Sequence, residues 1–111
     1  MRLRGTAQLL MAFALALQAQ QSMPRMTTVE PPNGKVGDVL AVAGENLDKV
    51  HVTEIYLTDG KKDHKIEMTE QEASSIKFKL PKTDPGRYSL MLLTAGKEPK
   101  LIEQPVKVTV E

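Results

Sequence analysis

The sequence predicts an all-β sandwich, on three observations. Short runs in which apolar and polar residues alternate with a period of two recur along the chain from residue 26 onward. Clusters of Gly, Pro, Asn and Asp separate these runs roughly every eight to twelve residues. No segment in this part of the chain sustains a helical period over three turns. About seven short strands with turns at this spacing are typical of two packed sheets.

The clearest strands are 106–110, where three valines alternate with polar residues, and 76–80, where apolar residues alternate with lysines. Ile55 and Leu57 differ in parity from the valines earlier in their run, so a β-bulge is expected near residues 53–54. Pro105 cannot donate a ladder hydrogen bond, which indicates an edge position or a bulge. The sequence predicts a loop over 69–74 and five further strands at 28–30, 39–43, 50–58, 64–68 and 87–93.

The first nineteen residues have the layout of a secretory signal peptide. Two arginines precede an apolar run at 9–17, and the small residue Ala19 stands before the expected cleavage site. Nine apolar residues in a helix reach only about 14 Å, against roughly 30 Å of bilayer hydrocarbon, so no stable membrane insertion is expected. The sequence therefore predicts a signal peptide at 1–19, a polar lead-in at 20–25 and one domain at 26–111, in a secreted or periplasmic protein.

Charge balance and the absence of cysteine exclude several classes of protein. Removing Arg2 and Arg4 with the leader reduces the 15 basic residues to 13, against 14 acidic residues. Proteins that bind nucleic acid present a clustered basic excess, so nucleic acid is excluded as a partner. The chain has no cysteine, which excludes disulfides, a thiol nucleophile, a thiolate metal site and a lipid anchor on cysteine. No cofactor is expected.

Residues 32–47 combine a proline, glycines at 34 and 37, a predicted strand and a Gly44-Glu45-Asn46-Leu47 corner. This stretch resembles the opening of IPT/TIG domains, the immunoglobulin-like folds shared by plexins, Rel-type transcription factors and bacterial surface proteins. Gly34 and Gly37 can adopt the positive φ that a tight crossing between strands needs. Gly44 followed by Asn46 suits a second sharp turn.

Residues 84–90, Asp-Pro-Gly-Arg-Tyr-Ser-Leu, resemble the segment that enters the sixth strand of immunoglobulin domains. In those domains a tyrosine near the start of the strand bonds back to nearby backbone, forming the tyrosine corner. The resemblance assigns this role to Tyr88, with Asp84 and Gly86 in the turn before it. Leu90 occupies the position of the disulfide cysteine, so packing alone would hold the sheets together. The family implies adhesion, protein contact or spacing, with no chemistry of its own.

The sequence offers no catalytic or metal-binding arrangement. His51 and His64 are the only histidines, and neither has a second histidine at the spacing of a local metal pair. Two lysines inside the loop 59–63 oppose a cation there. The serines at 74, 75 and 89 lie outside any Gly-x-Ser-x-Gly elbow. A protein that is not an enzyme is therefore expected.

Surface residues carry the remaining hypotheses. Lys77 and Lys79 are the outward positions of strand 76–80, where edge lysines oppose aggregation between sheets; a weak site for acidic polymers is the alternative. Tyr56 is the aromatic residue left to contact a sugar once Tyr88 is assigned to the corner. The leading hypothesis is a module for protein-protein interaction or structural spacing in the periplasm or at the cell surface, with another exported or envelope protein as its partner. The alternative is a carbohydrate-binding module.

Overall fold

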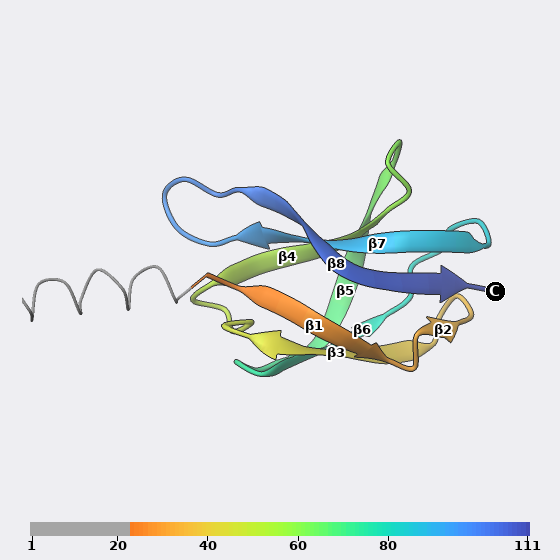
Figure 1. The fold of residues 1–111 in the computed structure, drawn as a ribbon, viewed down its shortest axis with the longest axis horizontal. Coiled ribbons are helices and arrows are strands. Elements are labelled where there is room, and N and C mark those ends of the chain that lie inside the picture. The colour runs from red at the N-terminus through yellow and green to blue at the C-terminus, as the bar shows by residue number, and fades with distance from the viewer. Residues whose placement is uncertain (1–22) are drawn as a thin grey trace, which may run out of the picture.

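The computed structural model describes residues 23–111, and this part of the chain contains eight strands and no helix (Figure 1). The all-β class expected from the period-two alternation is confirmed. The expected signal peptide and the first residues of the lead-in lie outside the described residues. In chain order the strands are β1 (Arg25–Glu30), β2 (Asn33–Gly34), β3 (Val39–Glu45), β4 (Val52–Thr58), β5 (Asp63–Gln71), β6 (Ser75–Lys79), β7 (Gly86–Thr94) and β8 (Leu101–Val110).

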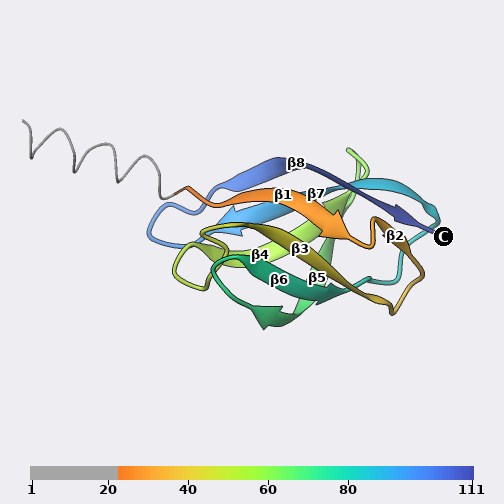
Figure 2. The same cartoon turned by 60° about the horizontal axis from the view of Figure 1, so that its bottom comes forward.

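One continuous sheet, in the order β1-β3-β6-β5-β4-β7-β8-β2, folds over on itself into two layers (Figures 1 and 2). The start of β5 pairs with β4 and its end pairs with β6, so this strand passes from one layer to the other. We call the layers the β1–β3–β6 layer and the β4–β7–β8 layer. Their strand orders match the two sheets of an immunoglobulin sandwich, which confirms the expected fold class.

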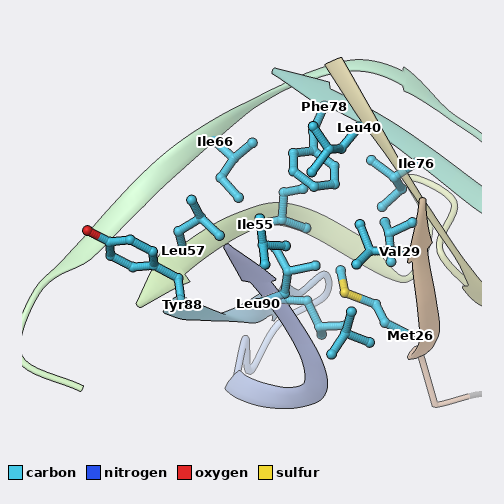
Figure 3. Close-up of a cluster of buried hydrophobic side chains, with 14 of the residues drawn as sticks. Met26, Val29, Leu40, Ile55, Leu57, Ile66, Ile76, Phe78, Tyr88 and Leu90 are labelled. Carbon is cyan, nitrogen blue, oxygen red and sulfur yellow. The ribbon is translucent and has the colours of Figure 1, made fainter. Parts of the chain in front are cut away.

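The core lies between the two layers and is built from alternate residues of each (Figure 3). Leu90, at the position of the immunoglobulin cysteine, is completely buried there. Phe78 is the largest of the completely buried side chains. Burial of apolar surface stabilises the fold by roughly 25 cal/mol per Å². The completely buried aliphatic residues around Phe78 and Leu90 include Val42, Leu47, Ile55, Leu57, Ile76 and Leu92.

Most strand limits differ by a few residues from the sequence prediction, and β2 lies where a turn was expected. Three of the differences bear on the architecture. Strand β5 continues to Gln71, so the loop expected over 69–74 begins only after that residue. Strand β4 begins at Val52, and the preceding residues, with Val50 79% exposed, lie in a turn. Strand β8 begins at Leu101 and passes Pro105 inside a register shift against β7, which confirms the expected bulge at this proline.

Strand β5 reaches Gln71 because this residue pairs with Ile76 of β6, and its side chain also contacts the segment that leads into β4. Its side-chain Nε2 donates to the carbonyl oxygens of Leu47 and Val52, each at 2.9 Å. The two bonds tie the end of β5 to the start of β4, where the β4–β5 pairing has ended. The register shift of β4 against β7 between Val52 and Glu54 confirms the bulge expected near residues 53–54.

One of the two glycines that begin the opening motif, Gly37, has the conformation expected from the sequence, and the other, Gly34, does not. Gly37 has the expected positive φ, at 93°. Gly34 does not; it lies buried in β2, where a Cβ would be 3.2 Å from the side chains of Leu40 and Leu80. The prediction of a positive φ at Gly34 is therefore wrong, and its small size is what the packing uses.

Gly44 lies inside β3 and not in a turn. A Cβ on Gly44 would lie 2.0 Å from the carbonyl oxygen of Arg25 and 2.9 Å from the Cα of Met26, because β1 passes against this residue. The sharp turn is instead made by Asn46, whose φ is 56°. Gly44 thus allows the close approach of two strands, in place of the turn that the sequence suggests.

The tyrosine corner is present at the start of β7. The Tyr88 hydroxyl donates to the carbonyl oxygen of Asp84 at 2.6 Å, four residues upstream. Thr83 Oγ1 lies 2.8 Å from the same hydroxyl. Gly86, at φ 155°, begins the strand opposite Val110. The hydroxyl therefore ties the loop before β7 to the strand itself.

Tyr88→Phe is expected to lower the free energy of unfolding by about 1 kcal/mol or more, because a nearly buried hydroxyl loses two partners. Urea denaturation followed by far-UV circular dichroism measures the change. Tyr56→Phe is the matched control: its hydroxyl lies on the outer face with one acceptor, Glu54, and its removal is expected to destabilise the protein less than Tyr88→Phe does. Equal stability of the Tyr88→Phe variant and the wild type would contradict a stabilising corner.

Candidate functional site

The structure separates the three surface residues that the sequence singles out. Tyr56 lies on the outer face of the β4–β7–β8 layer, whereas Lys77 and Lys79 lie on β6 in the other layer. Lys77 Nζ is 3.4 Å from Glu70 Oε2, and Lys79 stands opposite Glu67 in the β5–β6 register. Strand β6 lies between β3 and β5, so the interpretation of these lysines as edge-strand residues is wrong.

An apolar strip crosses the outer face of the β4–β7–β8 layer. Tyr56 stands opposite Met91, and Leu93 stands opposite Leu101. These four residues, which we call the Tyr56 strip, alternate with core residues and so point away from the core. Leu101 is 49% exposed, Tyr56 and Leu93 are half-buried, and Met91 is buried, at 8% exposed. The outward face of an antiparallel sheet is normally polar, so an apolar strip there indicates a contact surface.

Charged groups hold Tyr56 at one end of this strip. Its hydroxyl donates to the Glu54 carboxylate, whose other oxygen is 3.4 Å from Lys65 Nζ. The hydrogen bond from Tyr56, reinforced by Lys65, lowers the pKa of Glu54 below its usual value. The same bond, together with partial burial, raises the pKa of Tyr56. At neutral pH the tyrosine is therefore a neutral donor to a fixed carboxylate, which restrains its ring.

A polar hollow of about 500 Å³ adjoins the strip, between the β4–β5 turn and strands β7 and β8. The hydroxyl residues Thr58 and Ser89 lie nearly buried in it. Lys107 Nζ donates to Ser89 Oγ at 2.5 Å, and the lining also includes the charged residues Asp59, Arg87 and Glu103. Hydroxyl, ammonium, guanidinium and carboxylate groups together can bond a polar ligand.

The two histidines lie in different parts of the fold, His51 before β4 and His64 in β5. His51, expected within a strand, lies in a turn, with its Nδ1 2.7 Å from Asp48 Oδ1. That bond lowers the pKa of Asp48. His64 Nε2 is 3.3 Å from Thr83 Oγ1. Across residues 23–111, no three His, Asp or Glu side chains come close enough to one another to hold a metal ion.

Of the four residues of the Tyr56 strip, the sequence singles out Tyr56 alone. A signal was present in the run Leu90-Met91-Leu92-Leu93, which is apolar at both parities. With Leu90 and Leu92 assigned to the core, Met91 and Leu93 must point outward. Nothing comparable marks Leu101, whose place beside Leu93 follows from the pairing of β7 with β8.

No helix in the described part of the chain has the length and apolar content needed to span a membrane.

Comparison with known proteins shows the fold of this chain. No protein-family model matches it, and no curated protein does. A Bacteroides thetaiotaomicron protein of unknown function aligns over 80% of the chain at 19% identity with a TM-score of 0.67. The gamma-CGTase of alkalophilic Bacillus clarkii aligns over 80% at 22% identity with a TM-score of 0.55.

A third similar structure is the mixed-linkage glucan utilization locus protein SGBP-B of Bacteroides ovatus, solved with a mixed-linkage heptasaccharide. It aligns over 76% of the chain at 17% identity with a TM-score of 0.53. The chain spans 22%, 11% and 22% of the lengths of these three proteins, respectively. The chain is thus similar in fold to one domain-sized part of each of these larger proteins.

Proposed function

We propose that this chain is an exported, non-catalytic immunoglobulin-like module of the IPT/TIG type that binds another exported or envelope protein through the Tyr56 strip. The observation that carries the proposal is the block of four apolar side chains in neighbouring register positions on an outer sheet face. The leader-like segment at 1–19 supports export. The tyrosine corner supports the immunoglobulin-like type. The sequence resemblance at 32–47, with Gly37 at positive φ and the turn made at Asn46, supports the IPT/TIG assignment.

The strip has the organisation of a small protein interface. Tyr and Met are enriched at the centres of such interfaces, and charged residues surround them. Here Tyr56 and Met91 lie side by side, with Lys65 beyond the tyrosine and Glu103 beyond the methionine. The restraint of Tyr56 by Glu54 reduces the entropy that the ring loses on binding. Similarity to one part of each of several larger proteins supports the role of a module that contacts or spaces its neighbours.

A glycan is the second candidate ligand, because Tyr56 lies two residues along β4 from the hydroxyl-lined hollow at Thr58. A sugar ring can stack on a tyrosine while its hydroxyls bond to neighbouring polar groups. The similar fold in a glucan utilization locus protein that was solved with a heptasaccharide supports this alternative.

A photo-crosslinking amino acid at position 101 of the full chain tests the protein-binding proposal in the native envelope. The matched control is position 39, because Val39 is 53% exposed and lies in the other layer, while Leu101 is 49% exposed. We expect a discrete protein adduct from position 101 and none from position 39. The double variant Tyr56→Ala/Leu101→Ser is expected to weaken binding of the captured protein by about tenfold or more.

Equal crosslinking from positions 101 and 39 would contradict the proposal. Affinity electrophoresis in mixed-linkage glucan separates the two candidates. Retardation that is lost in Tyr56→Ala, with no specific protein adduct from position 101, would establish the glycan candidate in place of the protein partner.

A further inference from the structure

A second concave surface, with different chemistry, lies at the end of the sandwich that carries the β4–β5 turn. One hollow of about 470 Å³ is formed by this turn, the start of β5 and the loop before β7. A second hollow of about 350 Å³ is formed by β5, the end of β6 and the residues around Gly37. Lys82 lines both hollows, so they adjoin at this residue. We call the two together the lysine groove.

Positive charge dominates this groove. Its acidic residues are Asp59, Glu67 and Asp84. Among the described residues, Lys65 is the one groove lysine with an ion-pair partner, Glu54, and the other ammonium groups have none. The groove is lined by five lysines, Lys61, Lys62, Lys65, Lys79 and Lys82. Lys77, on the same strand as Lys79, differs from these lysines because it pairs with Glu70.

The acidic residue nearest the turn lysines positions them. Asp59 Oδ1 accepts the backbone N–H groups of Lys61 and Lys62, each at 2.8 Å. These two bonds are the main reason that the pKa of Asp59 is lowered. The carboxylate therefore fixes the turn through backbone groups and leaves both lysine side chains available to a ligand.

A directed chain of hydrogen bonds holds the other wall of the groove. The single proton of the Tyr88 hydroxyl goes to the Asp84 carbonyl, so Thr83 Oγ1 must donate to Tyr88 across the 2.8 Å contact. The Thr83 hydroxyl then accepts from His64 Nε2–H, at 3.3 Å. The His64 ring also packs edge-on against Tyr88, with centroids 6.1 Å apart. Residues of three segments are thereby locked together beside Lys82.

We propose that the lysine groove binds an acidic polysaccharide through its carboxylate or sulfate groups. Two adjoining hollows that share one lysine suit a polymer with repeated negative charges better than a single small anion. Lysine ammoniums are compact charges on flexible stems, which suits ligands whose charges vary in position. Leu80 and Pro81 add a small apolar wall against which a sugar ring can lie.

The lining favours a polysaccharide over an acidic protein. Protein hot spots are well-packed pockets that take Trp, Tyr or Arg anchors, whereas this groove is open to solvent and most of the residues that line it are charged. The groove shares no residue with the Tyr56 strip, so this inference goes beyond the proposed function and can fail independently of it.

Affinity measurements on the full mature chain test the proposal with three polymers: polygalacturonate for carboxylate, dextran sulfate for sulfate, and neutral mixed-linkage glucan. We expect binding to at least one acidic polymer, weaker at higher salt, and tenfold weaker or absent binding to the neutral glucan. Lys62→Gln/Lys82→Gln should weaken binding about fivefold or more. The control Lys97→Gln/Lys100→Gln removes the same charge from the exposed β7–β8 turn and should change binding less than twofold.

Several outcomes would overturn the inference. Equal losses from the two double variants would show that net charge alone attracts the polymer. Tighter binding of poly-glutamate than of either acidic polysaccharide would assign the groove to an acidic protein. If the wild-type protein is folded by circular dichroism and binds neither acidic polysaccharide, the proposed site does not exist. The variant Tyr56→Ala should bind these polymers like the wild type, which separates this result from the test of the Tyr56 strip.

Discussion

Phe78→Ala is expected to lower the free energy of unfolding by about 3–5 kcal/mol, the largest effect of any single change considered for this protein. Phe78 is completely buried in β6 and lies beside Leu40 of β3 (Figure 3). On its other side it pairs with Met68 of β5. Truncation removes the ring from a position where backbone pairing on both sides prevents the strands from closing over the cavity. A domain of this size is stable by only about 5–15 kcal/mol, so the variant should be close to unfolding at 37 °C.

Urea denaturation followed by far-UV circular dichroism measures this loss at 25 °C. The control is Lys77→Ala, the adjacent residue on β6, whose side chain is exposed and pairs with Glu70 on the surface. Its change should stay within about 0.5–1 kcal/mol, because an exposed ion pair contributes little. A loss below about 1 kcal/mol for Phe78→Ala would mean that the core is not packed around this ring.

Gly44→Ala is expected to destabilise the protein by about 2–3 kcal/mol, although it adds a single methyl group. The added Cβ would meet the carbonyl oxygen of Arg25 at 2.0 Å and the Cα of Met26 at 2.9 Å. Both are backbone atoms, so no side-chain rotation relieves the clash and β1 must move away from β3. The buried bond from the Met26 N–H to Gln104 Oε1, at 2.8 Å, links β1 to β8 and should be strained or lost with it.

Hydrogen exchange gives this second prediction a local readout. The Met26 amide should exchange faster in Gly44→Ala by more than the global loss of stability accounts for, since β1 opens first. Ala43→Ser, at the exposed neighbouring position on β3, is the control and should leave both stability and exchange close to wild type. Wild-type stability in Gly44→Ala would show that β1 does not press against this residue.

Much of the fold could be predicted because alternation is written in each strand's own residues. Val106, Val108 and Val110 identify one buried face without reference to any other segment, and all three are buried. The corner at Tyr88 is equally local, since its hydroxyl bonds to a carbonyl four residues away. The bulges at 53–54 and at Pro105 also follow from short stretches, as a break in parity and a residue that cannot donate.

The candidate surfaces could not be predicted in the same way, because each joins segments that are distant along the chain. Tyr56 meets Met91 only because β4 lies beside β7, and Lys62 shares a groove with Lys82 only because β5 and the loop before β7 meet at one end of the sandwich. The need for glycine at position 44 likewise depends on the passage of β1. The residues of a strand determine which of its faces is buried, because its apolar side chains avoid water and its polar side chains do not. Which strands lie beside it depends on interactions between side chains of different strands, so it cannot be deduced from one strand alone.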